Sequence, residues 1–265
     1  MTGLAAAAAA GLSYGWFEAG WARFRALEVP LERLPEELDG LRIAHLSDFH
    51  LGVPSRGLRA VDRAVDWVAA REPELVCITG DLLTKPAGEW HLNQLLGRLG
   101  GRPFIVLGNH DFALSRDPFS EPIELGLLER GELLLDRAVE VELRGRRVEL
   151  GGVDPRSWLA KRSSGFPTSD ADLRILLCHF PQALDHVPSG RWDLILSGHL
   201  HAGQIVLPYG AGRLMLAHPR APYSSGLYRR GSTEMHVSPG LGTTFVPFRF
   251  FARPEVTELV LRSVA

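Results

Sequence analysis

The feature that most constrains this chain is a series of short apolar runs, several of which end directly before an aspartate, an asparagine or a histidine. Runs of this length and composition are typical of buried strands. They occupy residues 41–47, 74–79, 103–107, 148–153, 173–178, 193–197 and 204–207. Between the first three runs lie two segments, 57–71 and 89–100, in which apolar residues recur at helical spacing. Strands that alternate with helices predict an α/β fold built on βαβ units and a largely buried sheet.

The two helical segments each carry a one-sided apolar stripe that would pack on the sheet. The stripes consist of Leu58, Val61, Val65 and Val68 in the first segment and Trp90, Leu92, Leu95, Leu96 and Leu99 in the second. Residues 132–153 and 204–260 hold shorter strand-like pieces among many turn residues, which predicts hairpins and a second sheet. A chain of 265 residues can bury a large core. We expect one folded domain over residues 29–265, preceded by an apolar segment over residues 1–28.

Composition and charge exclude some classes of protein. With 45% hydrophobic and 23% charged residues, the chain does not have the composition of a disordered protein. Its formal net charge of −2 lacks the surplus of Lys and Arg with which nucleic-acid binders neutralise phosphates, so no nucleic-acid partner is expected. Cys77 and Cys178 both lie inside apolar runs, which predicts buried free thiols and not a disulfide framework.

The N-terminus is uncharged and apolar. No charged side chain occurs from Met1 to Phe17, but this stretch is shorter than the ~20 apolar residues that typically span a bilayer, and it lacks the basic start of a secretory signal. Arg23 and Arg25 follow it and would hold the domain on the cytoplasmic side. Aromatic residues nearby would sit at headgroup depth: Trp16, Phe17, Trp21 and Phe24.

We therefore predict membrane association through residues 1–25, as an anchor or an interfacial helix, with the domain in the cytoplasm at the inner face of the cell membrane. The alternative is an alanine-rich helix that packs on the domain, or a frayed end.

Side chains able to bind metal recur at the ends of the apolar runs. They are Asp48 and His50 in SDFH, Asp81 in TGD, Asn109 with His110 and Asp111 in GNHD, His179 in CHF, and His199 and His201 in SGHLH. Ligand crevices of open α/β sheets form at strand ends, so we expect these five places to converge. Within the first and last motifs, an extended backbone would point both side chains to one side.

Each motif alone is a weak signal, because a histidine at a strand end is usually a hydrogen-bonded structural residue and asparagine suits turns. Taken together, they supply imidazole, carboxylate and amide donors with no thiolate. Such a set can hold two ions that share one carboxylate, and it suits borderline divalent metals such as Mn²⁺, Fe²⁺ or Zn²⁺. The sequence therefore predicts a dinuclear metal site.

The ordered set D-x-H, G-D, G-N-H-D, H and G-H-x-H resembles the calcineurin-like metallophosphoesterase superfamily, from about residue 41 to residue 201. The resemblance implies a four-layer α-β-β-α sandwich with two central mixed sheets and two divalent ions, with Mn²⁺ favoured. The first ion would be held by Asp48, His50, Asp81 and His201, and the second by Asp81, Asn109, His179 and His199. Asp81 would then bridge the two ions.

The resemblance also implies how such a protein would act as a metal-dependent hydrolase. Two cations lower the pKa of a bridging water, so a bridging hydroxide would attack phosphorus. His110 would bind no metal but would protonate the leaving oxygen, as its unperturbed pKa of ~6.5 allows near neutral pH. Asp111 would orient His110.

The C-terminal third narrows the resemblance to bacterial membrane-associated phosphodiesterases, including enzymes similar to UDP-2,3-diacylglucosamine pyrophosphatase. The segments that carry it are HAGQIVLP (201–208), YSSGLYRRG (223–231) and the stretch 235–261. It implies a phosphodiester or pyrophosphate substrate that is lipid-linked or nucleotide-linked. Ala202 and Pro239 depart from the pattern of that branch, at positions that usually hold glycine and often hold arginine.

A lipid-linked substrate predicts an apolar groove beside the metals, lined by Phe245, Phe248, Phe250 and Phe251; the alternative is that these rings only close the core. Two other functions stay open at this point. One is a phosphomonoesterase of nucleotides or phosphoproteins on the same scaffold. The other is a metal-binding scaffold protein without catalysis.

Overall fold

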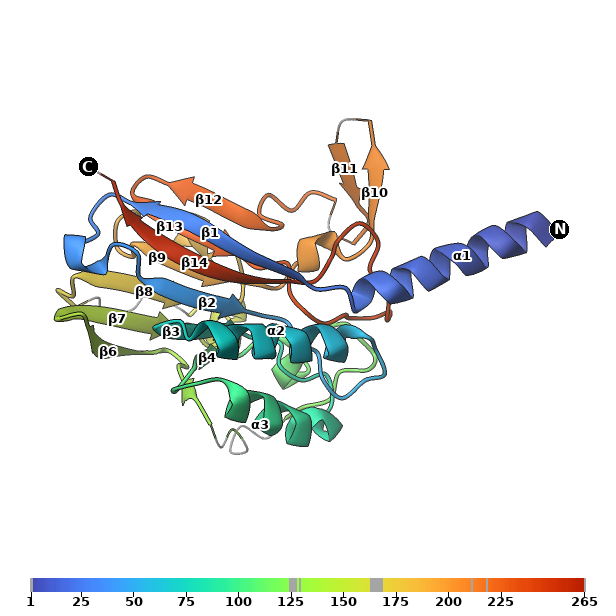
Figure 1. Cartoon of the computed structure of the whole chain (residues 1–265), viewed down its shortest axis with the longest axis horizontal. Helices are drawn as coiled ribbons and strands as arrows, with labels where there is room; N and C mark the ends of the chain where they lie inside the picture. Colours follow the sequence, from blue (N-terminus) through green and yellow to red (C-terminus); the bar gives the residue numbers. More distant parts are fainter. Residues whose placement is uncertain are drawn as a thin grey trace.

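The computed structural model describes residues 2–123, 128, 130–162, 169–210, 212–217 and 219–264. Two six-stranded mixed sheets form its centre (Figure 1). The first sheet has the order β1 (Arg23–Leu31), β14 (Glu255–Ser263), β2 (Arg42–Leu46), β3 (Leu75–Thr79), β4 (Phe104–Val106) and β5 (Glu132–Leu133). The second has the order β12 (Gly226–Arg230), β13 (Thr233–Val237), β9 (Leu194–Ser197), β8 (Leu173–Leu177), β7 (Arg146–Gly152) and β6 (Arg137–Leu143). A separate hairpin joins β10 (Val206–Tyr209) to β11 (Gly212–Met215).

Helices cover the outer faces of both sheets. They are α2 (Gly57–Arg71) and α3 (Glu89–Arg98) on the first sheet and the short α4 (Pro155–Leu159) and α5 (Ala183–His186) on the second. One apolar core lies between the sheets, where residues such as Ile43 and Val106 meet Leu150 and Ile175. Separate cores lie under α2 and α3 and under α4 and α5. The four-layer α-β-β-α sandwich is therefore confirmed.

The sheet registers place the functional loops at one edge. Strands β2, β3 and β4 are parallel and pair in register, as Leu46 with Ile78 and Thr79 with Val106 show. In the other sheet β8 and β9 are parallel and pair up to Leu177 and Leu196. Because carboxyl ends of parallel strands lie at the same edge, the residues that follow all five strands can meet there.

The helices follow the expected apolar stripes with one exception. The predicted bounds of α2 are those observed, and α3 ends two residues earlier than expected. The ring of Trp90 was expected to pack on the sheet, but it is 69% exposed, whereas Leu92, Leu95 and Leu96 are buried. Only those leucines lie on the face of α3 that meets the sheet.

The N-terminal segment joins the folded domain earlier than expected. Strand β1 pairs with β14 along its whole length, from Arg23 opposite Glu255 to Leu31 opposite Ser263. The boundary expected between residues 28 and 29 therefore falls inside β1. Backbone pairing with a strand far away in the sequence, which residues 1–28 alone do not reveal, ties this segment to the sheet.

Helix α1 (Thr2–Ala19) projects from the body of the molecule (Figure 1). Its last turn is tied to the domain, because the Glu18 carboxylate accepts hydrogen bonds from the backbone N–H groups of Phe251 and Ala252 at 3.0 and 2.6 Å. Residues 3–10 are all exposed. Among the described parts of the chain, no helix is both long and apolar enough to cross a membrane.

Candidate metal centre

Six of the seven predicted metal ligands converge at the shared edge of the two sheets. They form two groups, in each of which one ligand atom per residue lies within 4.8 Å of the others. We call Asp48, His50, Asp81 and His201 the first ligand group, and Asp81, His179 and His199 the second ligand group. We count the seventh predicted ligand, Asn109, with the second group, because the N–H of the adjacent His110 bonds Asp81. The first sheet supplies Asp48, His50, Asp81 and Asn109 after β2, β3 and β4, and the second supplies the other histidines after β8 and β9.

Asp81 lies between the two groups. Its Oδ2 is 3.6 Å from His50 Nε2 and 3.1 Å from His179 Nε2, so one carboxylate oxygen faces an imidazole of each group. The backbone N–H of His110 donates to its other oxygen, Oδ1, at 2.8 Å. A Cβ on Gly108 would overlap this carboxylate, which explains why glycine precedes Asn109.

The side-chain oxygen of Asn109, Oδ1, is buried without a hydrogen bond from any described residue. Asn109 follows β4 and lies between Gly108 and His110, whose N–H groups bond the carboxylates of Asp111 and Asp81. A buried amide oxygen normally has a hydrogen-bond donor or a cation beside it.

The backbone at the ligands is left-handed at five of the six residues. The φ angles are 56° at Asp48, 48° at His50, 52° at Asp81, 81° at His199 and 50° at His201. This conformation is uncommon outside glycine and stores about 1–3 kcal/mol per residue, so the surrounding fold must impose it. The extended backbone expected for the first and last motifs was therefore wrong, because the chain turns at each ligand.

Side chains behind the ligands hold the imidazoles. His50 Nδ1 bonds Thr84 Oγ1 at 3.1 Å, and His179 Nδ1 donates to the carbonyl of Thr79 at 2.7 Å, which leaves both Nε2 atoms facing the site. The guanidinium of Arg249 lies 3.2 Å from His201 Nδ1.

Arg249 was not predicted from the sequence. It is fully buried and donates to the carbonyl oxygens of Gly242, Pro239 and Ala252. Burial lowers its pKa to about 10, so it stays charged at neutral pH. The signal for it was an arginine flanked by two phenylalanines in the apolar run FVPFRFF.

The electrostatics of the two groups differ. Burial alone would lower the pKa of His179, but the carboxylates of Asp81 and Asp48 raise it to about 9. Burial raises the pKa of Asp48 to about 6, with the Asp81 charge adding to the effect. Burial, with a contribution from His110, lowers the pKa of His50 to about 3. The protein without ions therefore pairs a protonated His179 with Asp81, whereas His50 is neutral.

His110 faces the first ligand group, with its ring centroid 4.6 Å from that of His50. We expected Asp111 to orient this ring. Instead, the Asp111 carboxylate is buried and accepts backbone N–H groups from Leu82, Leu83 and Gly108, so it ties two loops together. Burial raises the pKa of Asp111 to about 7.

Other side chains surround the His110 ring. Ser115 Oγ lies 3.3 Å and Asp117 Oδ2 3.9 Å from its Nδ1, while Thr244 Oγ1 lies 3.4 Å from its Nε2. Neither Asp117 nor Thr244 was predicted to touch His110: Thr244 comes from a loop distant in the sequence, and Asp117 from a nearby turn in which no periodicity indicates the contact.

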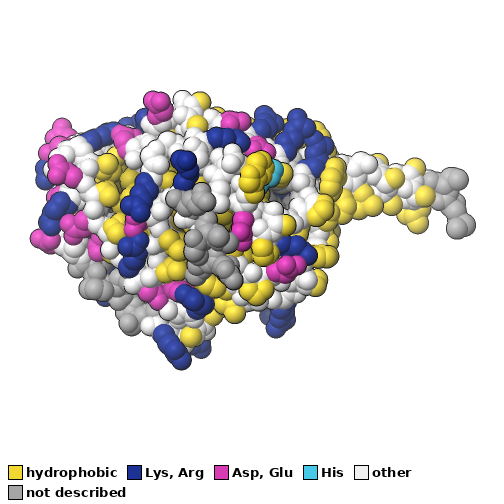
Figure 2. Space-filling view, turned by 90° about the horizontal axis from the view of Figure 1, so that it is seen from below, with side chains coloured by type: hydrophobic (Ala, Val, Ile, Leu, Met, Phe, Trp, Pro, Cys, Tyr) yellow, Lys and Arg dark blue, Asp and Glu magenta, His cyan; other side chains and the backbone are white. Residues whose placement is uncertain are grey.

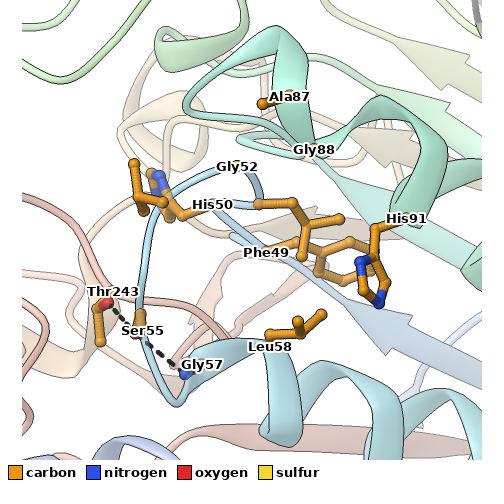
Figure 3. A pocket seen from close by; sticks show the side chains of 12 residues that line it. Phe49, His50, Gly52, Ser55, Gly57, Leu58, Ala87, Gly88, His91 and Thr243 are labelled. Atoms are coloured by element: carbon orange, nitrogen blue, oxygen red, sulfur yellow. Dashed lines mark hydrogen bonds between the residues drawn. The ribbon is translucent and has the colours of Figure 1, made fainter.

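The loop over residues 239–244 closes the site from one side. The N–H groups of Leu241 and Gly242 donate to the carbonyls of Ser47 and Asp48 at 3.1 and 2.6 Å. Ser55 links this loop to the start of α2, since its Oγ bonds Thr243 Oγ1 at 2.7 Å and accepts from the N–H of Gly57 at 3.0 Å (Figure 3). The figure also shows His50 and His91 on opposite sides of the small pocket that this loop borders.

An apolar cleft of about 410 Å³ opens beside His110. Its walls are Val53, Pro54, Phe119, Phe245, Val246 and Pro247, and its polar residues include Thr84, Asp117 and Thr244. Phe245 lines this cleft, and so does Thr84, which bonds the predicted ligand His50. The other three phenylalanines were placed wrongly: Phe248 packs on Trp16 of α1, and Phe250 and Phe251 pack on Tyr14.

A four-layer α/β sandwich with two groups of cation ligands that share Asp81 defines a protein with a candidate dinuclear metal centre. Residues 41–203 match the family described as calcineurin-like phosphoesterase. The chain belongs to this family.

The relatives include proteins from vertebrates and bacteria. A "Transmembrane protein with metallophosphoesterase domain" from Danio rerio is 33% identical over 89% of this chain and 56% of that protein. The "Uncharacterized metallophosphoesterase YkuE" of Bacillus subtilis is 30% identical over 87% of this chain and 82% of its own length. The "Phosphodiesterase YaeI" of Escherichia coli is 28% identical over 92% of this chain and 90% of its own length. The chain thus spans about half the length of the vertebrate relatives.

Proposed function

We propose that this protein is a metal-dependent phosphoesterase that hydrolyses a phosphodiester or pyrophosphate bond. The observation that carries the proposal is the pair of ligand groups that share Asp81 beside an imidazole, His110, that belongs to neither group. This arrangement supports phosphate-ester hydrolysis, in which cations bind the substrate oxygens and a separate acid meets the leaving group.

The residues present fit two divalent ions. Two pairs of imidazole nitrogens face each other at 3.1 Å, His50 Nε2 with His201 Nε2 and His179 Nε2 with His199 Nδ1. Two imidazole nitrogens this close need a proton or a cation between them, and the buried Asn109 Oδ1 needs a partner as well. We propose the first and second ligand groups as the two sites, with Mn²⁺ favoured and Fe²⁺ or Zn²⁺ as alternatives for this N/O donor set. When bound, the ions supply positive charge for the phosphate oxygens and lower the pKa of water.

The protein's own residues supply the proton and hold the reacting groups in position. His110 delivers a proton to the leaving oxygen, and Ser115, Asp117 and Thr244 set the orientation of its ring. Asp111 holds the loops after β3 and β4 together, so that Asp81 and Asn109 keep their positions. Gly108 leaves room for the Asp81 carboxylate.

The test compares two aryl phosphates with purified protein loaded with Mn²⁺. We expect turnover of bis(p-nitrophenyl) phosphate to exceed that of p-nitrophenyl phosphate, to disappear after chelation and to return with metal. Faster turnover of the monoester would favour the phosphomonoesterase alternative. Two bound ions without turnover of either ester would favour the scaffold alternative and overturn the proposal.

We further propose that the substrate is lipid-linked, for example UDP-2,3-diacylglucosamine, and that α1 docks the protein at the inner face of the cell membrane. Figure 2 shows hydrophobic side chains along α1 and where α1 meets the body. Leu12, Phe17 and Trp21 are 52%, 49% and 41% exposed there. Apolar and aromatic side chains in such an arrangement suit the interface of a bilayer.

Flotation with phosphatidylglycerol-containing vesicles tests the docking. We expect the full chain to float with the vesicles and the double variant Leu12→Glu/Phe17→Glu to stay behind. Trp90→Glu is the control, because Trp90 is exposed on α3, away from α1. A wild-type chain that never floats, or a control that fails as the variant does, would contradict membrane docking.

A further inference from the structure

The apolar cleft beside His110 is a built feature of the fold that the metal centre does not use. It measures about 410 Å³, within the usual range of ligand pockets. Two segments, 52–54 after β2 and 243–247 before β14, supply most of its lining, including the apolar side chains of Val53, Pro54, Phe245, Val246 and Pro247. Phe119 and Phe245 are each 50% exposed at its mouth.

Several polar atoms of the residues that line the cleft are already paired. Asp117 Oδ1 accepts the N–H of Phe119 at 2.9 Å, and Oδ2 accepts the Thr244 hydroxyl at 2.9 Å and the N–H of Phe245 at 3.0 Å. Lys85, on the cleft wall, forms an ion pair with Glu121 at 2.8 Å. A sugar or a nucleobase needs partners for its own polar groups, so this cleft favours a hydrocarbon group over either of them.

The position of Thr244 indicates which part of a substrate, relative to the phosphate, would enter the cleft. Thr244 lines the cleft, and its hydroxyl is 3.4 Å from His110 Nε2. Thr84, which also lines the cleft, bonds His50 of the first ligand group. A group that fills the cleft is therefore attached on the side of the phosphate that faces His110.

The lining of the cleft is followed in the sequence by a residue that contacts α1. Its wall ends at Pro247, and the next residue, Phe248, packs on Trp16 with ring centroids 6.2 Å apart. Residues 245–248 therefore run from the cleft to α1, the helix proposed to meet the membrane.

We propose that this cleft binds a hydrocarbon chain carried by the leaving group of the substrate, with Phe245 as a specificity-determining residue. The inference rests on the proposed phosphodiesterase function. It adds that the hydrocarbon chain is on the leaving-group side of the bond that is broken. Water forms the new bond to phosphorus, the bond from phosphorus to the hydrocarbon-bearing oxygen breaks, and that oxygen leaves with the proton from His110. For a phosphodiester, the products are a phosphate monoester and an apolar alcohol; for a pyrophosphate, the hydrocarbon leaves on a phosphate of its own.

Methyl octyl phosphate tests this assignment, because its two ester oxygens have similar intrinsic reactivity. With the metal-loaded full chain, we expect octanol and methyl phosphate as the main products, and a kcat/KM about tenfold above that for dimethyl phosphate. Octyl phosphate and methanol as the main products, or equal kcat/KM for the two diesters, would overturn the proposal.

A matched pair of variants isolates the cleft. Phe245 and Phe251 are both 50% exposed and both have left-handed backbone, with φ of 58° and 52°, but only Phe245 lines the cleft. We expect Phe245→Ala to lower the octyl-over-methyl preference at least about threefold and Phe251→Ala to leave it unchanged. An equal effect of both variants would overturn the role of Phe245.

Measurements of binding without turnover can test the cleft independently of the proposed phosphodiesterase function. By calorimetry, octyl phosphate should bind at least about tenfold more tightly than methyl phosphate, and Phe245→Ala should reduce the difference. If this holds but neither methyl octyl phosphate nor bis(p-nitrophenyl) phosphate is hydrolysed, the cleft binds hydrocarbon and the proposed function fails. If bis(p-nitrophenyl) phosphate is hydrolysed but chain length affects neither binding nor rate, the cleft inference fails alone.

Discussion

The two ligand groups share Asp81 but differ in how the protein encloses them. Every side chain of the first ligand group is buried, and Thr84 and Arg249 stand behind its histidines. In the second ligand group His199 is partly exposed, and no described residue bonds Asn109 Oδ1. Although the Thr79 carbonyl holds His179, the second group is thus more open to solvent and has one buried donor atom that awaits a partner. We expect the second ion to exchange more readily than the first.

Asp81→Asn is expected to have the largest effect, because it removes the carboxylate that both groups share. The amide keeps the shape of the side chain but loses its charge, so both ions should be lost and kcat/KM should fall by about 10⁴-fold or more. Metal analysis of the purified variant, together with turnover of bis(p-nitrophenyl) phosphate, measures both effects.

Asp154→Asn is the control, since Asp154 is a buried carboxylate that caps α4 and belongs to neither ligand group. Two retained ions in Asp81→Asn would contradict the sharing of Asp81.

His110→Ala should separate catalysis from metal binding. We expect kcat to fall about a thousandfold, as for loss of a general acid, while both ions stay bound. His186→Ala, on α5, should change neither quantity. Unchanged turnover in the His110 variant would rule out its role at the leaving oxygen.

Arg249→Lys should weaken ion binding at the first ligand group alone, because Arg249 contacts His201 of that group. The lysine keeps the positive charge but cannot reach His201 and the carbonyls of Gly242, Pro239 and Ala252 together. We expect an affinity for the first ion about 10- to 100-fold lower, with the second ion little changed. Titration with a competing chelator, with Arg253→Lys as the control on the same segment, measures it. Equal loss at both sites would contradict the assignment of Arg249 to the first group.

The pH dependence of ion binding should differ between the groups. With no ion bound, His179 has a pKa of about 9, so an ion entering the second group displaces a proton at any lower pH. Its affinity should rise by up to about tenfold per pH unit up to about pH 9. In the first group the ligand with the highest pKa is Asp48, at about 6. The affinity for the first ion should therefore stop rising above about pH 6. Titrations of His201→Ala and His199→Ala, which leave the second and the first group respectively, check this.

The raised pKa of His179 should also make the stability of the ion-free protein depend on pH. The pKa of His179 is raised from ~6.5 when unfolded to about 9 when folded, so the charged imidazole stabilises the fold fully below pH ~6.5. This contribution is lost as the pH rises through 9. The melting temperature of chelated protein should follow that course, and a melting temperature that rises over this range would contradict the shift.

The sequence predicts the parts of this molecule that depend on periodicity and on strand ends. The stripe of Val61, Val65 and Val68 predicted the bounds of α2, because burial of that face determines the helix. The polar residues after β2, β3, β4, β8 and β9 were found because parallel strands carry their ends to one edge.

Other parts depend on contacts between segments that are far apart in the chain. The left-handed backbone at His50 and His199 is imposed by neighbouring loops and leaves no pattern in the sequence. Asp117 and Arg249 reach His110 and His201 through loop positions that no periodicity fixes. The local sequence made Asp111 the natural partner of His110, but the backbone amides of the loop after β3 take up its carboxylate.

Anomalous X-ray scattering from crystals grown with Mn²⁺ tests the central claim most directly. The account predicts two peaks per chain, one among Asp48, His50 and His201 and one among Asn109, His179 and His199, with Asp81 contacting both. A single peak, or peaks that do not share Asp81, would contradict it.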